Sequence, residues 1–163
     1  MTTPQPEAGP EAQPEAEPEA WSDAPSPRLL FLWRGDFTDP EVDALHAAAF
    51  GGDAPDPGAP TPWRARLERH SVGWVCARPE TGGPLLGFVN VLWDGGVHAF
   101  LLDTAVDPAA RRTGVGTLLV AAAADGARAA GCDWLHVDFE PHLRGYYLDA
   151  CGFRPTDAGL LAL

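Results

Sequence analysis

The chain has 163 residues, of which 45% are hydrophobic, and this length and composition fit one compact domain with a single core better than two domains. Its formal net charge of −12 argues against nucleic-acid binding, because proteins that hold a phosphate backbone carry a basic patch or stripe. All 11 basic residues are arginines, and a chain without lysine excludes a Schiff-base lysine mechanism.

The three cysteines are odd in number and show no C-x-x-C spacing, which argues against both a disulfide framework and a zinc ribbon. No apolar run approaches the about 20 residues that a membrane span requires. The N-terminus also lacks the basic start and apolar stretch of a secretory signal. We therefore expect a soluble protein that stays in the cytoplasm and has no membrane partner.

Residues 1–27 are dominated by proline, glutamate and alanine, and their one aromatic residue is Trp21. Such a segment buries too little apolar surface to offset the loss of chain entropy on folding. We predict a disordered acidic tail over 1–27 and a folded domain over 28–163.

The folded domain is predicted to begin with a strand over 28–33, a short apolar run. A helix is predicted next, because Thr38 or Asp39 is a suitable N-cap and Gly51-Gly52 is a stop signal. The residues predicted on its inner face are Val42, Leu45, Ala48 and Ala49.

Segment 51–60 is rich in Gly, Pro and Asp and is predicted to be a loop, followed by a short helix over 63–70. Two apolar runs, 72–77 and 85–93, flank a turn rich in Pro and Gly, and this pattern is typical of a hairpin. A third run, 98–106, is apolar on both faces, which indicates an interior strand of the same sheet.

Residues 114–130 have helical periodicity, and a strand is predicted over 134–139. A last helix is predicted over 141–150, and a closing strand or hairpin over 153–163. The order strand, helix, strand makes a right-handed crossover, so strands 98–106 and 134–139 must run parallel in a mixed sheet. The inner face of the first of these helices is predicted to carry Val115, Leu118, Leu119, Ala122 and Ala123.

The pattern Arg111-x-x-Gly114-x-Gly116 between a strand and a helix indicates a phosphate-binding turn. There, successive backbone N–H groups and the positive end of the helix dipole point into one small volume. Glycines let a phosphate approach the amides, and Arg111 and Arg112 are expected to add charge-assisted hydrogen bonds. A P-loop is excluded because no Gly-Lys-Ser/Thr is present, and Leu119 stands where the dinucleotide fingerprint has its third glycine.

These residues resemble the GNAT superfamily of N-acetyltransferases, whose signature (Gln/Arg)-x-x-Gly-x-(Gly/Ala) follows a strand of the type Asp-Leu-Ala-Val-x-Pro. Here Asp103-Thr-Ala-Val-Asp-Pro108 precedes Arg111-Arg-Thr-Gly-Val-Gly116. The closing helix of the family is of the type Phe-Tyr-Glu-x-x-Gly-Phe, and here Tyr146-Tyr-Leu-Asp-Ala-Cys-Gly-Phe153 stands in its place. The resemblance covers all of the predicted folded domain.

The resemblance implies an α/β (α+β) fold with a twisted mixed sheet of about six or seven strands and about four flanking helices. It implies that the two parallel strands splay apart around acetyl-CoA. The strand residues whose backbone would pair with the pantetheine arm are Thr104, Ala105 and Val106. The residues that would form the pyrophosphate site are Arg111, Arg112, Thr113, Gly114, Val115, Gly116 and Thr117. Within this turn, Arg112 replaces a usual glycine and Thr113 a usual basic residue.

Acetyl transfer from a thioester to an amine requires a neutral nucleophile, a polarised carbonyl and a proton for the departing thiolate. The candidate bases are Asp103, beside the cofactor groove, and Glu140, which stands where many family members have Asn. For Asp103 the alternative is a carboxylate satisfied by backbone or arginine groups. The resemblance implies that Tyr147 protonates the thiolate and that a strand N–H near Val106 polarises the carbonyl. Tyr147 stands one residue further from Gly-Phe than usual, so Tyr146 and a distorted helix remain alternatives.

No metal is expected, because His98, His136, His142 and Asp138 do not form a ligand-spacing pattern and strand histidines are more often core or rim residues. We expect an enzyme that uses acetyl-CoA as co-substrate and an unidentified amine as acceptor. A protein N-terminus or an aminoacyl-tRNA is a further acceptor class, and the acidity disfavours tRNA. The alternative function is a non-catalytic acyl-CoA-binding or sensor module with the same fold. The oligomeric state stays open between a monomer and a homodimer.

Overall fold

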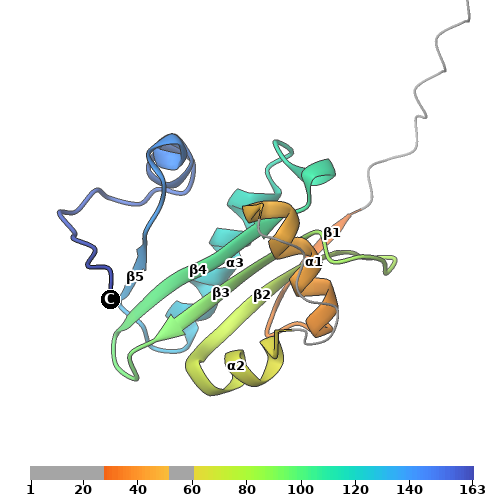
Figure 1. Ribbon diagram of the computed structural model, residues 1–163, viewed down its shortest axis with the longest axis horizontal. Helices are drawn as coiled ribbons and strands as arrows, with labels where there is room; N and C mark the ends of the chain where they lie inside the picture. Colours follow the sequence, from red (N-terminus) through yellow and green to blue (C-terminus); the bar gives the residue numbers. More distant parts are fainter. Residues whose placement is uncertain (1–27, 52–60) are drawn as a thin grey trace, which may run out of the picture.

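The computed structural model describes residues 28–51 and 61–163, so the predictions for residues 1–27 and 52–60 lie outside the described residues. The described chain forms one five-stranded sheet in the order β1-β2-β3-β4-β5 (Figure 1). Strands β1 to β4 pair antiparallel, and β4 and β5 run parallel, which confirms the predicted mixed sheet. The strands are β1 (Leu29–Trp33), β2 (Ser71–Pro79), β3 (Gly87–Trp93), β4 (His98–Val106) and β5 (Trp134–Val137).

Helices cover both faces of the sheet. Helices α1 (Asp39–Phe50) and α2 (Trp63–His70) lie on one face, and α3 (Val115–Ala129) lies on the other (Figure 1). Helix α1 has the predicted signals at both ends, since Thr38 is its N-cap and Gly51 ends it in the left-handed conformation. The bounds of α2 and β4 agree with the prediction to the residue.

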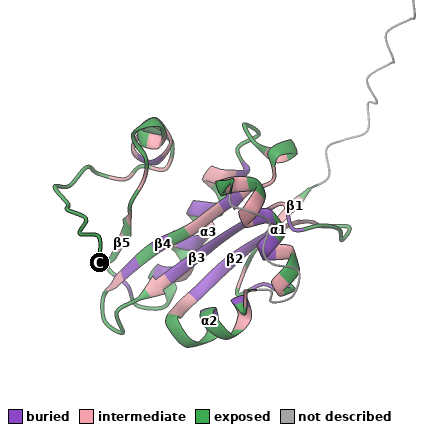
Figure 2. Ribbon diagram, viewed as in Figure 1, coloured by how far each residue is buried: buried purple, intermediate pink, exposed green. Residues whose placement is uncertain are grey.

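The core between the sheet and the α1/α2 layer contains aromatic side chains. Trp63, Trp74 and Phe88 are each at most 3% exposed, and Val42 and Leu45 of α1 join them as predicted. The prediction for Ala48 is wrong, because this residue is exposed and is not among the side chains that pack in this core. Burial runs along most of β2 and β3, which lie in the middle of the sheet (Figure 2).

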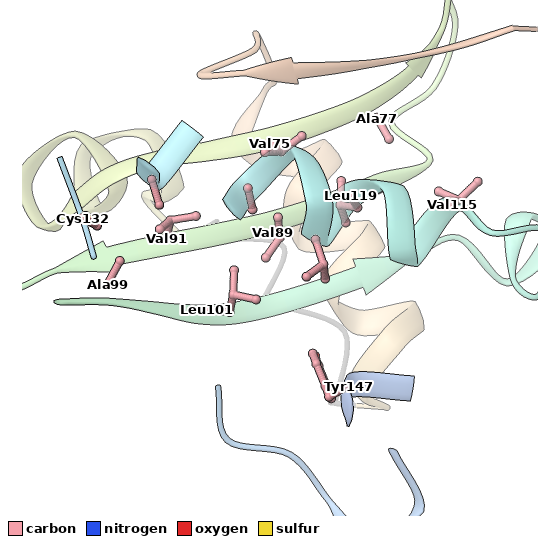
Figure 3. Close-up of a cluster of buried hydrophobic side chains, with 13 residues drawn as sticks. Val75, Ala77, Val89, Val91, Ala99, Leu101, Val115, Leu119, Cys132 and Tyr147 are labelled. Atoms are coloured by element: carbon pink, nitrogen blue, oxygen red, sulfur yellow. The ribbon is translucent and has the colours of Figure 1, made fainter. Parts of the chain in front are cut away.

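A second core lies between the sheet and α3, and it is built mainly from small aliphatic side chains (Figure 3). Val75, Val91 and Leu101 reach it from the strands. The prediction that Leu118 faces this core is wrong, because its side chain is 55% exposed. Residues four apart lie on nearly the same face of an α-helix. The buried face of α3 begins at Val115 and repeats every four residues, and Leu118 does not lie on it. The buried residues of α3 are Val115, Leu119, Val120, Ala123 and Ala127.

The parallel strands β4 and β5 pair over four residues only and then separate. The last pair in register is Leu101 with Val137, whereas β4 continues to Val106. The strand predicted over 134–139 is therefore two residues too long. After β5 the chain turns away from β4 (Figure 1). The splayed parallel pair is present, and the carboxyl half of β4 has no strand partner on this side within the described residues.

A β-bulge in β4 lies where the splay begins. Between the pairs Asn90–Leu102 and Phe88–Ala105, β3 advances by two residues and β4 by three. The extra residue is accommodated by Asp103, whose φ of 56° is in the left-handed region. Leu101 packs in the α3 core, but Ala105 packs in the α1/α2 core, so the bulge has exchanged the two faces of the strand.

The predicted helix over 141–150 is a 3₁₀ turn, η2 (Pro141–Leu143), followed by a π-helical turn, η3 (Gly145–Ala150). The amide of Cys151 donates to the carbonyl of Tyr146, a bond that spans five residues and defines the π turn. Each such turn holds one residue more than an α-helical turn. The helix is thus distorted by one extra residue, which accommodates the longer spacing between Tyr147 and Gly152-Phe153. A distorted helix was one of the alternatives that the sequence left open.

The closing strand predicted over 153–163 is absent from the described structure, so the sheet has five strands instead of the expected six or seven. Leu160 and Leu161 are 95% and 81% exposed, so this segment lacks the apolar packing that a strand on the sheet would have. Within the described residues, no helix is both long and apolar enough to span a bilayer.

Candidate active site

The predicted phosphate-binding turn joins β4 to α3. The chain is left-handed at Arg112 (φ 63°) and at Gly114 (φ 88°), which is the N-cap of α3. None of the backbone amides from Arg112 to Thr117 donates to an acceptor within residues 28–51 or 61–163. These amides gather at the positive end of α3, so the turn suits an anion such as a pyrophosphate.

The side chains of the turn hold it in place. The Arg111 guanidinium donates to the Val106 carbonyl at 3.1 Å and to the Ala48 carbonyl at 3.0 Å, and so ties the end of β4 to α1. The Thr113 hydroxyl donates to the Ala110 carbonyl at 2.7 Å. Part of the Arg111 side chain is thus committed to the fold, and its bond to a phosphate stays a prediction. Arg112 is exposed at the turn.

Asp103, a predicted site residue, points toward α1 and α2 as a result of the bulge. Its carboxylate accepts from Arg66 at 3.1 Å and from the buried amide of Asn90 at 3.2 Å. The Nε2 atom of His46 lies 3.4 Å from its other oxygen. The Ser71 hydroxyl in turn donates to Asn90 at 2.6 Å. The structure therefore surrounds Asp103 with arginine, histidine and amide groups.

Sequence reasoning missed His46, Arg66 and Asn90. These residues come from α1, α2 and β3, and no spacing in the sequence links them to Asp103. A signal existed for Asn90 alone, since it is a polar residue in the middle of an apolar strand and buried amides in strands usually have a partner. The cluster forms because the bulge turns Asp103 toward the face that α1 and α2 cover.

Tyr147 lies on the opposite side of β4 from this cluster. It is 5% exposed and belongs to the core on the α3 side of the sheet (Figure 3). Its ring stacks on Phe139 with 5.1 Å between ring centroids. Burial raises the pKa of the Tyr147 phenol, and a hydrogen bond with the Thr104 side chain partly offsets that rise. The predicted acid and the predicted pantetheine strand are thus in contact.

Tyr146, the alternative acid, points toward the phosphate-binding turn. Burial raises the pKa of its phenol. Its hydroxyl is buried and has no hydrogen-bond partner of ordinary geometry among the described residues. The Cys151 thiol beside it is only a weak hydrogen-bonding group. The two adjacent tyrosines therefore point to different places: Tyr146 contacts the phosphate-binding turn and Tyr147 contacts Thr104 of β4.

Glu140 is exposed and lies three residues beyond the end of β5. Its side chain makes no ion pair or hydrogen bond with the described part of the chain. The structure thus does not bring this predicted base together with Asp103.

Two of the predicted rim histidines contact each other across the parallel strands, with 2.8 Å between Nδ1 of His98 and Nε2 of His136. In residues 28–51 and 61–163 there is no group of three side chains that could ligate a metal ion.

Two open pockets lie beside β5 and the C-terminal segment, and α3 lines only the first of them. One of about 300 Å³ lies next to the phosphate-binding turn and is lined by Thr117, Ala121, Cys151 and Arg154. The other, of about 520 Å³, follows the outer side of β5 and is lined by His136, Asp138, Phe139 and Arg144. Thr117 therefore connects the turn with a hollow large enough for part of a nucleotide.

Comparison with known proteins agrees with this geometry. A family model described as the acetyltransferase (GNAT) family matches residues 7–153. No curated protein matches the chain.

Many solved structures share the fold at low sequence identity. An acetyltransferase from Trypanosoma brucei superimposes with a TM-score of 0.64 at 20% identity, covering 83% of this chain and 100% of the other. A glucosamine-6-phosphate N-acetyltransferase from Arabidopsis thaliana gives 0.62 at 15% identity, over 82% and 98% of the two chains. A GNAT family N-acetyltransferase from Escherichia coli, solved with CoA, gives 0.61 at 21% identity, over 80% and 71%.

Proposed function

Because the chain belongs to the GNAT acetyltransferase family, we propose that it transfers the acetyl group of acetyl-CoA to a primary amine by direct attack in a ternary complex. The observation that carries this proposal is the row of unbonded amides from Arg112 to Thr117 at the start of α3. These amides follow directly on the carboxyl half of β4, where β5 has left the sheet. An anion site next to an open strand edge suits a ligand with a pyrophosphate and an amide-bearing arm.

The backbone of Thr104, Ala105 and Val106 binds the pantetheine arm in this proposal. The edge of β4 beyond Leu101 has lost its strand partner, so its N–H and C=O groups are free to pair with the amides of the arm. One N–H of this segment, near Val106, polarises the thioester carbonyl. A backbone donor held in a sheet needs no reorganisation during the reaction, which makes it effective in stabilising a developing oxyanion.

Tyr147 is the proposed acid that protonates the thiolate of CoA. Its phenol lies beside Thr104, where the pantetheine arm would end, and its raised pKa keeps it protonated at neutral pH. Tyr146 is the weaker candidate, because its hydroxyl points to the turn that would hold the pyrophosphate.

Asp103 and Glu140 remain the sequence-derived candidates for the base. Asp103 lies at the bulge beside Thr104, close to the proposed acetyl position, whereas Glu140 is exposed and beyond the end of β5. Location supports Asp103. Its pairing with Arg66 also supports the alternative of a satisfied carboxylate with no direct part in proton transfer.

A small primary amine is the proposed acceptor. The acidic composition disfavours tRNA. One protein of similar fold is named for acetylating glucosamine-6-phosphate, which also supports a small amine. A cytoplasmic location and a homodimer stay predictions.

The proposed function is tested by incubating the full chain with acetyl-CoA and a panel of primary amines, while free CoA thiol and acetylated products are measured. The proposal predicts thiol release that depends on an amine and matches the acetylated product mole for mole. Binding of acetyl-CoA without turnover across the panel would instead favour the non-catalytic acyl-CoA-binding module.

A further inference from the structure

The bulge in β4 places two polar groups on opposite sides of one strand. Asp103 faces α1 and α2, and the next residue, Thr104, faces Tyr147. In the proposed reaction a proton must leave the amine and another must reach the thiolate. From this arrangement we propose that His46 accepts the proton of the acceptor amine and that Asp103 is its positioning residue. This inference rests on the acetyl transfer proposed above.

The position of His46 suits a proton acceptor. Its side chain is 36% exposed, so an acceptor can reach it from solvent. Its ring is held by aromatic neighbours, with ring centroids 4.5 Å from Phe50 and 5.4 Å from Trp63. The Nε2 atom faces Asp103 at 3.4 Å, and Nδ1 makes no hydrogen bond with residues 28–51 or 61–163, so Nδ1 is the nitrogen assigned to receive the proton. Catalytic hydrogen bonds are often long before substrate binds, so this contact fits an orienting role.

Asp103 is better placed to orient a histidine than to act as the base. One of its oxygens already accepts from Arg66 and from Asn90, and Asn90 is itself fixed by Ser71. The lone pairs of this oxygen are therefore already engaged by two donors within the protein. The same donors fix its orientation, so the oxygen at 3.4 Å from His46 can hold the ring in one position.

Charged groups from three elements lie around His46. Asp103 on β4 lies 3.4 Å from its Nε2 atom, Arg66 on α2 donates to the same carboxylate, and Asp43 of α1 accepts from the indole of Trp63, which packs against the His46 ring. Imidazole is the side chain that most often serves as a general acid or base in enzymes.

An acceptor ammonium gives one proton to Nδ1 of His46, and the neutral nitrogen attacks the thioester carbonyl. The N–C bond forms, the C–S bond breaks, and the thiolate takes the phenolic proton of Tyr147. Water then takes the proton from His46, and the tyrosinate takes the second proton of the attacking nitrogen through solvent, so the sum is one amide, one free CoA thiol and one proton.

The test compares two acceptors that differ in their need for a base. n-Butylamine is charged at pH 7.5 and must lose a proton, whereas 2,2,2-trifluoroethylamine is already neutral at that pH. His46→Gln is expected to lower kcat/KM for n-butylamine by about 10²-fold or more and to leave trifluoroethylamine within a few fold. His70→Gln, a change of an exposed histidine at the end of α2, is the matched control and should alter neither. Equal losses for both amines in His46→Gln would overturn the assignment.

A second measurement isolates the role of Asp103. The ring protons of His46, assigned by comparison with His46→Gln, are followed through a pH titration by NMR in the wild type and in Asp103→Asn. The proposal predicts that the titration midpoint falls in Asp103→Asn, because the charged ring loses its carboxylate. An unchanged midpoint would refute the pairing. If the wild type binds acetyl-CoA but acetylates neither these two amines nor any amine of the panel described above, the proposed function fails, and the His46–Asp103 pairing is still decided by the NMR titration.

Discussion

The hydroxyl of Tyr146 lies against Gly116, so that a Cβ at Gly116 would be 2.8 Å from the Tyr146 oxygen. Real Cβ atoms essentially never approach another heavy atom this closely, so one side chain would have to move. Packing within the protein therefore requires a glycine at position 116, in addition to any requirement that a phosphate approach the backbone there. It makes room for a tyrosine whose hydroxyl has no hydrogen-bond partner in the described chain.

This contact predicts that Gly116→Ala destabilises the protein and that adding Tyr146→Phe restores most of the stability. Gly116→Ala should lower the free energy of unfolding by about 1–3 kcal/mol, because the methyl group overpacks the site. Tyr146→Phe alone should be neutral or stabilising, because it removes a buried hydroxyl without a partner. In the double variant the nearest ring carbons are 3.3 Å and 3.4 Å away, so most of the stability should return. Urea denaturation of the four proteins measures this, and additive losses in the double variant would argue against the contact.

The assignment of Tyr147 as the acid makes a different prediction for the neighbouring residue. Tyr147→Phe should lower kcat by about 10²-fold and leave the Kd for acetyl-CoA nearly unchanged, since the ring and its stacking on Phe139 remain. Tyr146→Phe is the matched control, with the same chemical change one residue earlier. Steady-state kinetics with any amine that the enzyme accepts would decide this. A larger loss of kcat in Tyr146→Phe would reverse the roles of the two tyrosines.

Trp33 explains why a glycine, Gly126, occupies the last turn of α3. Its ring fills the space where a Cβ of Gly126 would stand, and it also lies against Gly73 of β2. Gly126→Ala normally favours a helix by about 1 kcal/mol, but here we expect a loss of roughly 3 kcal/mol from overpacking. Trp33→Leu should restore tolerance for the alanine. If thermal denaturation shows Gly126→Ala to be stabilising, the packing of Trp33 on α3 is contradicted.

Most of the element order could be predicted from the sequence, because local signals agreed with the tertiary packing. The hairpin from β2 to β3 has a turn rich in Pro and Gly, and α1 has a cap and a glycine stop. The turn before α3 could be identified because glycines at fixed spacing between a strand and a helix are typical of a phosphate-binding turn. The parallel pair followed from the handedness of crossovers.

The parts that could not be predicted depend on one inserted residue or on tertiary contacts. The bulge at Asp103 and the π turn at Tyr146 each add one residue to a regular element, and hydrophobic periodicity has no signal for either. For the π turn, the tyrosine spacing left a distorted helix open as one alternative, whereas nothing in the sequence indicated the bulge. The bulge decides which face Asp103 joins, so the cluster with His46 and Arg66 was invisible in the sequence. Strand β5 ends at Val137, two residues before its predicted end, because β4 and β5 separate after the Leu101–Val137 pair. The point of separation depends on both strands and cannot be read from the sequence of β5 alone.

The ion pair between Glu41 and Arg78 predicts a pH dependence of stability. Arg78 donates to both carboxylate oxygens of Glu41, at 2.8 and 3.0 Å, and the Arg78 hydrogen bond lowers the pKa of Glu41 to about 2 from 4.5. The folded pKa is depressed, so the stabilisation is fully present above pH 4.5 and is lost as the pH falls from there toward 2. Partial exposure screens the pair, so we expect a contribution of about 1 kcal/mol.

Glu41→Gln is the variant that tests this pair. Its melting temperature should be lower than that of the wild type at pH 7, and the difference should shrink as the pH falls toward 3, because protonation removes the same charge from the wild type. Thermal denaturation across this pH range measures the effect. A difference between the two proteins that stays constant with pH would contradict the depressed pKa.

The most direct test of the account is calorimetric titration of the protein with acetyl-CoA, using two glycine variants of similar backbone strain. Gly114 in the phosphate-binding turn has φ 88° and Gly95 in the turn before β4 has φ 81°, and at each of them a Cβ would stand in open space. Wild type and Gly95→Glu should bind acetyl-CoA with a Kd on the order of micromolar, whereas Gly114→Glu should bind at least about tenfold more weakly while remaining folded. Equal affinities in Gly114→Glu and Gly95→Glu, or no binding by the folded wild type, would contradict a pyrophosphate site at the start of α3.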